Sequence, residues 1–521
     1  MSEGQTGGLG GGGANGRTTA GARPDRPGGT ADVPQRSSDV PGGMFGGVFA
    51  RGGLVADDAA WLRAMLAAEA ALARALERAG LVSAGVGASV TAAAARTGDF
   101  DLAELSQSSA LTGNPVPGLA RALTRLVAGP AAKAAVHKGA TSQDIMDTAA
   151  MLLARDAIDA IADSLSGAAA AAARLADAHR GTLMIGRTLL QQAVPVTFGV
   201  VAAGWLAGLD GALDGLASVR ESRLAVQFGG AAGTVASLGP SGAQVKSLMA
   251  GELGLLDPPL PWHTERLRII DVAVAMTRVT AALSKIARDV TLLAQTEIGE
   301  VSEGTEPTAG GSAPRRGGSS AMPNKNNPVA AVAILGCARQ SGGLLVTLVA
   351  SAEQEHQRAA GAWHAEWQPY SHLLQLAVSA AAWARDLLAN LTVNQPRMAA
   401  NLAATGGLPM AERVTALLRD SLGAPQAHDL VAVAAARATS AGVPLRDALL
   451  ATPDVASKLS QAGISAENID QALDPANYLG ASDAFISATL SAHTTPSAHT
   501  TPSAHTAPSA RTTAPPTPHA R

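Results

Sequence analysis

The chain has 521 residues, enough to bury a large core and to form about three domains. Its 39 Lys and Arg residues nearly balance its 42 Asp and Glu residues, and the formal net charge of −3 argues against nucleic acid or an anionic membrane as a partner. Aromatic residues make up only 3% of a chain rich in alanine and leucine, so helices are favoured over β-sandwiches.

The number of cysteines and the first residues of the chain indicate the cellular compartment in which the protein is expected. The single cysteine, Cys337, excludes an internal disulfide framework and fits a reducing cytosol. It lies within an apolar run, which predicts a buried, unreactive thiol. No secretory signal is visible, since residues 7–13 are nearly all glycine. We expect a cytoplasmic protein.

Both ends of the chain have compositions typical of disorder. Residues 1–43 are rich in glycine and lack a repeating apolar face. Residues 488–521 repeat Ser-Ala-His-Thr-Thr-Pro at six-residue spacing, which brings back a histidine at positions 493, 499 and 505. Weak metal binding is the alternative interpretation of these histidines, and a disordered tail is favoured.

Between the tails, the apolar periodicity predicts three helical regions, and so an all-α fold. Residues 44–132 form a small N-terminal helical domain, in which Gly80 is a plausible helix stop. Residues 133–393 form a central bundle, and residues 394–487 form a C-terminal helical domain. The clearest central helix has apolar residues three and four apart, as packing against other helices requires: Ile269, Val272, Met276, Val279, Leu283, Ile286, Val290 and Leu293.

Two further stretches carry structural expectations. Residues 188–209 contain no charge, but Gln191, Gln192 and Pro195 argue against a membrane span, so we expect a helix buried on all sides. The spacing of the glutamates in an acidic run does not indicate a metal site, so we expect this run at a solvated helix end. The run consists of Glu297, Glu300, Glu303 and Glu306.

The most informative stretch runs from Gly317 to Val329. Gly317 and Gly318 permit backbone angles denied to other residues, and Lys325 and Asn327 offer a positive charge and a carboxamide. Pro328 suits the first position of the following helix, whose positive end would face the same anion. The stretch therefore predicts a loop that closes over an anionic ligand. Composition alone leaves a plain surface loop equally open.

A second candidate stretch covers residues 137–148. Thr141 and Ser142 precede a helical pattern, so either can form a helix cap. Hydroxyl groups at a helix start are also well placed to receive a carboxylate, so capping and binding are compatible. His137 is a further candidate ligand, although a lone histidine is more often structural.

The order of residues in both stretches resembles signature sequences of the fumarase/aspartase superfamily. The superfamily pattern Gly-Ser-Ser-x-Met-Pro-x-Lys-x-Asn-Pro is met at every fixed position from Gly318 to Pro328. The resemblance implies that Ser319 exchanges the proton beside a carboxylate, while Lys325 and Asn327 bind and polarise that carboxylate. It implies substrate-binding roles for the other candidates: Asn114, His137, Thr141, Ser142, Thr188, Gln191, Ser320 and Met322. For Asn114, within Gly113-Asn114-Pro115, an ordinary turn is equally favoured.

A third signature of the superfamily departs from its usual form. Where fumarases and several lyases have a histidine after the threonine, this chain has Leu189, and the position of the paired glutamate holds Val332. A hydratase or ammonia-lyase needs such an acid or base at the β carbon. A carboxylate within the substrate is already ionised at pH 7 and needs none, so intramolecular lactonisation is the expected chemistry.

Lactonisation is the chemistry of the superfamily branch that interconverts 3-carboxy-cis,cis-muconate and a carboxymuconolactone in protocatechuate degradation, the β-ketoadipate pathway. The chain also resembles this branch at residues 227–234, 261–266 and 354–367. The resemblance implies a cycloisomerase acting on a small tricarboxylate without metal or organic cofactor. It also implies a homotetramer, built on the central bundle, in which different subunits contribute to each active site.

Departures from the branch keep alternatives open. Asn324 and Asn326 stand where the branch has His and Arg, and Arg315 and Arg316 could restore the lost positive charge. One alternative is another lyase of the superfamily, such as an adenylosuccinate-type enzyme, which the missing histidine disfavours. The other is a catalytically inactive structural homologue, which the presence of Ser319, Lys325 and Asn327 disfavours.

Overall fold

The computed structural model of the protein describes residues 46–304, 317–318, 321–322 and 325–495. Several predictions lie outside the described residues: those for the tail 1–43, for most of the C-terminal repeat, and for Arg315, Arg316, Ser319, Ser320 and Asn324. The boundaries drawn between the three helical regions stay predictions.

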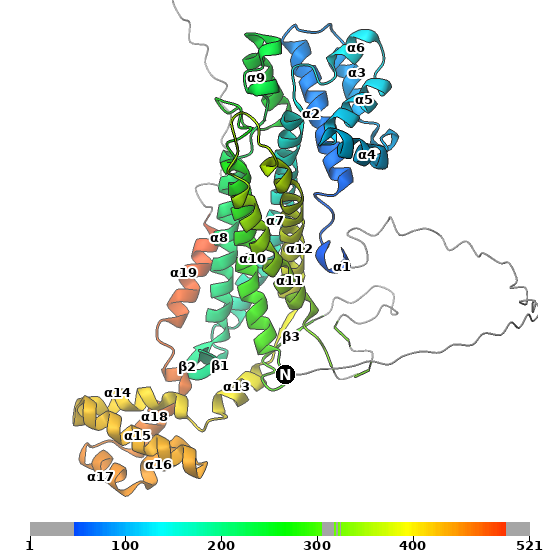
Figure 1. Ribbon diagram of the computed structural model, residues 1–521. Helices are drawn as coiled ribbons and strands as arrows, with labels where there is room; N and C mark the ends of the chain where they lie inside the picture. Colours follow the sequence, from blue (N-terminus) through cyan, green and yellow to red (C-terminus); the bar gives the residue numbers. More distant parts are fainter. Residues whose placement is uncertain (1–45, 305–316, 319–320, 323–324, 496–521) are drawn as a thin grey trace, which may run out of the picture.

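Five long helices form a bundle that runs the length of the molecule (Figure 1). They are α7 (Ser142–Ala178), α8 (Phe198–Ser222), α10 (Leu267–Leu293), α11 (Val329–Ala350) and α12 (Ala362–Ala389). Every residue of the predicted apolar seam on α10, from Ile269 to Leu293, is buried. The all-α fold class is therefore confirmed, and Cys337 lies buried on α11 as expected.

The N-terminal region packs against one end of the bundle, which we call the upper end because it lies at the top of Figure 1. Its main helix is α2, which begins after Asp57, whose side chain accepts a hydrogen bond from the Ala60 N–H, and ends just before Gly80. This main helix, α2, spans Asp58–Arg78. The other elements at this end are short: α3 (Val86–Ala94), η2 (Thr97–Asp99), α4 (Leu102–Thr112), α5 (Val116–Leu126) and α6 (Pro130–Ala135). Also at this end are η3 (Gly230–Ala232), η4 (Ala236–Leu238) and α9 (Ser241–Leu253). The short helix α1 (Gly46–Phe49) lies further down, against α11 and α12.

Short strands occupy the opposite, lower end of the bundle. Strands β1 (Leu183–Thr188) and β2 (Gln191–Thr197) form an antiparallel hairpin, and β3 (Val301–Glu303) pairs antiparallel with β4 (Leu391–Val393). The expectation of one buried helix over residues 188–209 was thus wrong up to Thr197. The β-branched residues Val194 and Val196 and the polar side chains of β2 fit an extended strand, and α8 begins only at Phe198.

The C-terminal region has a hydrophobic core of its own, from Val414 to Ala472, separate from the main core. Its elements follow α13 (Gln395–Ala403): η5 (Leu408–Met410), α14 (Ala411–Leu422), α15 (Ala424–Ala441), α16 (Leu445–Ala451), α17 (Pro453–Gln461), α18 (Ala466–Leu473) and η6 (Pro475–Asn477). The last helix, α19 (Ser482–Thr494), returns to the bundle and packs along α8 (Figure 1).

Helix α19 corrects the expected start of the C-terminal tail at residue 488. Ile486 is fully buried in the main core, and Leu490 packs against it. His493 Nδ1 lies 2.9 Å from Asp210 of α8, and Arg180 binds Asp483 at 2.8 Å. These contacts hold residues 488–494 in a helix, although their composition is that of the repeat.

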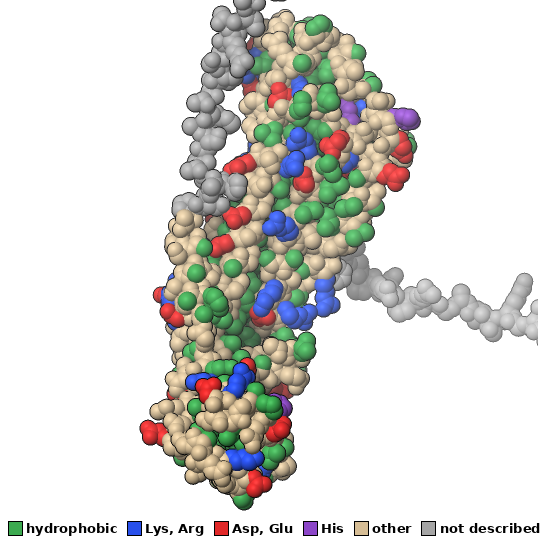
Figure 2. Space-filling view, turned by 90° about the vertical axis from the view of Figure 1, so that its left-hand side faces the viewer, with side chains coloured by type: hydrophobic (Ala, Val, Ile, Leu, Met, Phe, Trp, Pro, Cys, Tyr) green, Lys and Arg blue, Asp and Glu red, His purple; other side chains and the backbone are tan. Residues whose placement is uncertain are grey.

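The bundle leaves apolar surface uncovered. By length and hydropathy alone, α8 and α11 could cross a membrane, yet both pack in the bundle, with 39% and 33% of their most apolar windows buried. On α11, the side chains of Val332, Val346 and Val349 are exposed. Figure 2 shows the side of the bundle on which α8 and α19 lie, where hydrophobic side chains are interspersed with charged ones. The exposed valines show that a single chain leaves α11 incompletely covered.

Candidate active site

The residues predicted to form one site lie at two ends of the bundle. Thr141 and Ser142 are at the start of α7, at the upper end, and the hairpin that carries Thr188 and Gln191 follows the far end of the same helix. Because α7 has 37 residues and rises 1.5 Å per residue, it is about 55 Å long. One chain therefore does not bring the two groups of candidates together.

At the upper end, Asp144 joins three segments of the chain. Its Oδ1 accepts from the Gly229 N–H at 2.8 Å and lies 2.7 Å from His263 Nε2. Its Oδ2 accepts from the Gly230 and Thr141 N–H groups, each at 2.9 Å. The carboxylate is fully buried, so it fixes the start of α7 against the loops at residues 229–230 and 261–266. The predicted cap at Thr141 is confirmed, and Asp144 is its partner.

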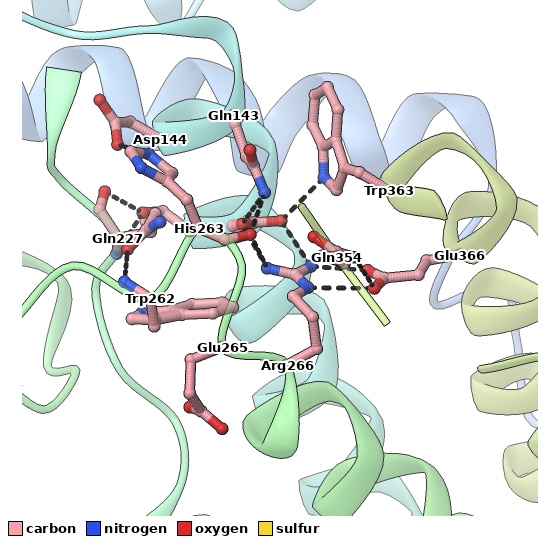
Figure 3. A network of polar contacts seen from close by, with 12 residues as sticks. Gln143, Asp144, Gln227, Trp262, His263, Glu265, Arg266, Gln354, Trp363 and Glu366 are labelled. Carbon is pink, nitrogen blue, oxygen red and sulfur yellow. Dashed lines mark hydrogen bonds and ion pairs between the residues drawn. The ribbon is translucent and has the colours of Figure 1, made fainter. Parts of the chain in front are cut away.

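Beneath this junction lies a buried ionic network (Figure 3). Arg266 binds Asp147 at 2.7 and 3.0 Å and Glu366 at 2.6 and 3.0 Å, and all three side chains are at most 4% exposed. Burial opposes the charge of Arg266, but the two carboxylates outweigh it and raise its pKa above the ordinary value. Trp363 donates to Asp147, and Gln354 donates to Glu366. The network ties α7, α10 and α12 together below the candidate residues.

His137 and Asn114 also lie at the upper end. His137 Nδ1 is 2.6 Å from Glu69 Oε1, and the His137 N–H donates to Glu69 Oε2 at 3.0 Å. Asn114 follows the C-terminal cap of α4, and its Oδ1 accepts from the Val116 N–H at 3.1 Å, as an ordinary turn requires. His364, at the start of α12, lies 3.1 Å from the carbonyl of the adjoining Gly113.

The described part of the signature loop, at the lower end, closes on itself. The Asn327 N–H donates to the Gly317 carbonyl at 2.8 Å, and the Asn327 side-chain amide donates to the same oxygen at 3.1 Å. Gly317 has φ +81°, and a Cβ there would lie 2.4 Å from the Asn327 carbonyl, so only glycine fits. Between these ends, Met322 and Lys325 are exposed.

The start of α11 differs from the expectation that it faces the ligand. Glu303 accepts from the N–H groups of Ala330 and Ala331 at 3.0 and 2.8 Å, so a carboxylate of the chain already occupies the helix N-terminus. Pro328 is the cap residue and not the first helical residue. The solvated end expected for the acidic run was wrong for Glu300 and Glu303, because both are buried and Glu300 binds Arg187 at 2.7 Å. Glu297 is exposed as expected, and Glu306 lies outside the described residues.

The hairpin tip at the lower end is apolar and strained. Leu189 and Leu190 form the turn with φ +51° and +64°, values that residues other than glycine rarely adopt. Both are exposed, Leu189 by 96%, and Thr188 and Gln191 flank them. The next residue, Gln192, contacts the C-terminal region through Thr405 at 3.1 Å. This tip places Leu189 where the third signature of the superfamily has its histidine.

Sequence reasoning missed the residues that hold the upper end together, above all Glu69, Asp144 and Arg266. A signal for Glu69 was present: it lies four residues after Met65 and three before Leu72, on the apolar face of α2. A lone carboxylate on such a face implies a buried partner. Among the described residues, no group of three His, Cys, Asp or Glu side chains could hold a metal ion.

Comparisons with known proteins agree with this architecture. The lyase family model matches residues 55–343, and the model for the adenylosuccinate lyase C-terminus matches residues 407–489. A 3-carboxy-cis,cis-muconate cycloisomerase of Bradyrhizobium diazoefficiens is 44% identical over 439 residues, covering 84% of this chain and 94% of the relative. A nitrosuccinate lyase of Streptomyces davaonensis is also 44% identical over 439 residues, covering 82% and 90%.

Among solved structures, the 3-carboxy-cis,cis-muconate lactonizing enzyme from Pseudomonas putida superposes with a TM-score of 0.77 at 38% identity, covering 84% of this chain and 95% of that one. A family model that spans more than half of the chain, and relatives matched over nine-tenths of their own length, agree with the helical bundle described above. The chain therefore belongs to the lyase family whose members include the 3-carboxy-cis,cis-muconate cycloisomerases.

Proposed function

We propose that this enzyme is an intramolecular lyase that interconverts 3-carboxy-cis,cis-muconate and a carboxymuconolactone. The observation that carries the proposal is the match to cycloisomerases over nearly their whole length, in a chain with Leu189 and Val332 at the positions of the water-activating pair. In the lactonising direction, one substrate carboxylate forms a carbon–oxygen bond, and the π electrons move toward the carbon beside another carboxylate. That carbon then takes up a proton.

The roles of the site residues follow from this chemistry. Ser319 exchanges the proton, and Lys325, Asn327, Thr141 and Ser142 hold the negative charge that develops on the carboxylate beside it. The remaining candidates contact the substrate: Asn114, His137, Thr188, Gln191, Ser320 and Met322. The exposed positions of Met322, Lys325, Thr188 and Gln191 at the lower end support this assignment, because a ligand can reach all four. The reaction requires neither a metal nor an organic cofactor.

The working unit of the proposed enzyme is a homotetramer with shared active sites. Two features of the single chain support it. The candidates lie at opposite ends of α7, so a site that uses both groups needs another copy of the chain. The exposed Val332, Val346 and Val349 of α11 also give the bundle an apolar face for such a copy to cover. The substrate partner is a small tricarboxylate, and the cytoplasm stays the predicted location.

A second candidate function is elimination of an anionic leaving group from a substituted succinate. It is favoured by the nitrosuccinate lyase relative, whose identity to this chain equals that of the first cycloisomerase. A nitro group that leaves as nitrite needs no general acid, since nitrite is stable as an anion at pH 7. The absence of a histidine at Leu189 therefore fits this reaction as well.

The experiment follows loss of the conjugated-diene ultraviolet absorbance when the purified protein meets 3-carboxy-cis,cis-muconate. We expect loss with the wild type and with Ser166→Ala, a control at an exposed serine of α7, and none with Ser319→Ala. A parallel reaction with nitrosuccinate, read by nitrite release, tests the second function. Nitrite release without muconate turnover would replace the first function by the second. No activity of a folded tetramer in either assay would refute both functions.

A further inference from the structure

Glu69 is a buried carboxylate in the middle of an apolar helix face. Glu69 as a whole is 1% exposed, and its neighbours on the same face of α2 are Met65, Leu72 and Leu76. Burying an ionised carboxylate costs several kcal/mol unless hydrogen bonds and charge compensate it. The partners of Glu69 therefore reveal what this acid does in the fold.

Both carboxylate oxygens of Glu69 serve His137. Oε1 lies 2.6 Å from the His137 Nδ1, and Oε2 accepts from the His137 backbone N–H at 3.0 Å. His137 has φ +59°, a conformation that costs a non-glycine residue energy, and these two contacts help to hold it there. Gly139 fixes the turn from the other side, because a Cβ there would lie 2.7 Å from Leu238.

The surroundings of His137 favour its charged form. Burial is the largest single influence and lowers the pKa of His137, but the hydrogen bond and charge of Glu69, with the charge of Asp144, outweigh it and raise the pKa above its ordinary value. The only other charged group in this turn, Lys138, directs its Nζ to the Leu81 carbonyl at 3.1 Å. The Glu69 side chain is fully buried, whereas 24% of the His137 side chain is exposed.

One nitrogen of His137 stays available for a ligand. Nδ1 is engaged by Glu69, while Nε2 has no hydrogen-bond partner among the residues that the structure describes. His137 precedes Thr141 by four residues, so this N–H belongs to the turn that leads directly into the start of α7. A carboxylate bound at that helix start would meet the backbone N–H groups, the hydroxyls and an imidazolium donor together.

We infer that Glu69 is a positioning residue of the proposed active site, which orients His137 and places a negative charge beside its Nδ1, so that Nε2–H grips one carboxylate of the tricarboxylate substrate. This inference rests on the proposed function and adds a residue of α2 that touches no substrate itself. A purely structural dyad, which only ties α2 to the turn at residues 137–140, is the competing interpretation.

The test compares Glu69→Gln with Glu77→Gln in the full-length protein. Glutamine at 69 can keep both contacts by accepting from the backbone N–H and donating to a neutral imidazole, so it removes charge with little loss of packing. Glu77 is a matched control on the same helix, because its carboxylate also accepts two backbone hydrogen bonds, from Gly85 and Gly87. Histidine C2-hydrogen exchange read by mass spectrometry reports the pKa of His137 without any substrate.

We expect Glu69→Gln to lower the pKa of His137 and to raise KM for 3-carboxy-cis,cis-muconate at pH 7.5 about tenfold, with kcat little changed, because the donor to the substrate carboxylate becomes a neutral imidazole in place of a cation. The increase should fade at a pH low enough to protonate the histidine of the variant. In a His137→Gln background, the same substitution should add nothing to KM. Glu77→Gln should leave both quantities unchanged.

The outcomes separate this inference from the proposed function. An unchanged pKa, or a lowered pKa with unchanged KM, would overturn the inference while turnover continued. If the wild type does not consume muconate, the proposed function fails, and the dissociation constant of the inert tricarboxylate tricarballylate, from calorimetry, takes the place of KM. A tenfold weakening at pH 7.5 that low pH restores would then still support the inference, and no binding to the wild type would overturn it.

Discussion

Replacing Asp144 by asparagine should loosen the upper end of the bundle, because an amide cannot reproduce the contacts of the carboxylate. Each oxygen of Asp144 serves two donors: the Gly229 N–H and His263 at Oδ1, and the Gly230 and Thr141 N–H groups at Oδ2. In either orientation, the NH₂ of asparagine faces at least one buried backbone N–H. The remaining donors keep a neutral acceptor in place of an anionic one.

The size of the effect follows from these contacts. One stranded buried N–H costs about 1–3 kcal/mol, and exchanging an ionised for a neutral acceptor weakens each remaining bond by about 1 kcal/mol. With the NH₂ at the Oδ1 position, one N–H is stranded and two bonds to the other oxygen weaken, so the loss is about 3–5 kcal/mol. The main core spans roughly 350 residues, for which an unfolding entropy near 2.1 cal/mol/K per residue converts this loss into a fall in Tm of about 4–7 °C.

Far-ultraviolet circular dichroism at one heating rate and one protein concentration measures this fall. Asp156→Asn is the control, since Asp156 lies on the same helix but its side chain is 60% exposed, and among the described residues it pairs only with its neighbour Arg155. We expect the control to shift Tm by less than about 1 °C, as surface ion pairs contribute little. A shift for Asp144→Asn no larger than that of the control would refute the role given to Asp144.

Three further predictions concern other parts of the molecule. Arg266→Met should destabilise the protein by about 3–5 kcal/mol, because it leaves two buried carboxylates without their cation, and a normal urea midpoint would contradict this. Gly317→Ala should reduce kcat/KM by about tenfold or more while Tm hardly changes, because alanine at φ +81° strains the loop and meets the Asn327 carbonyl; full activity would show that the loop need not close this way. Burial raises the pKa of the Cys337 thiol to about 11, so iodoacetamide at pH 8 should label it slowly in the native protein and quickly in urea, and equal rates would contradict its burial.

Local sequence patterns correctly predicted helices with a regular apolar periodicity or a clear N-terminal cap. The apolar seam of α10 and the start of α7 at Thr141 were both found where the sequence placed them, because periodicity and capping depend on residues within one or two turns. Residues 188–197 show the limit of this reasoning. An uncharged run suits a buried helix and a strand equally, and the hairpin partner of β2 decided between them.

The candidate site stays a prediction made from residue types and their order, and the residues that support it in the fold were not predicted. Glu69 and His137 are 68 residues apart, and Asp144 and His263 are 119 apart, so no local pattern relates them. Glu303 illustrates the same limit, since its carboxylate caps a helix that begins 26 residues later. Long-range partners of this kind are set by how the helices pack, which periodicity alone does not give.

The return of α19 to the bundle changes how the C-terminal region should be regarded. Because Ile486 belongs to the main core, the segment between α13 and α19 begins and ends on the same scaffold, like a domain inserted into a surface loop. An insert held at both ends cannot drift away when its own fold loosens, and a single proteolytic cut inside it leaves both fragments attached. Shortening the chain before Ser482, in contrast, removes a helix of the bundle itself. Helix α19 is thus part of the main scaffold that carries the C-terminal insert.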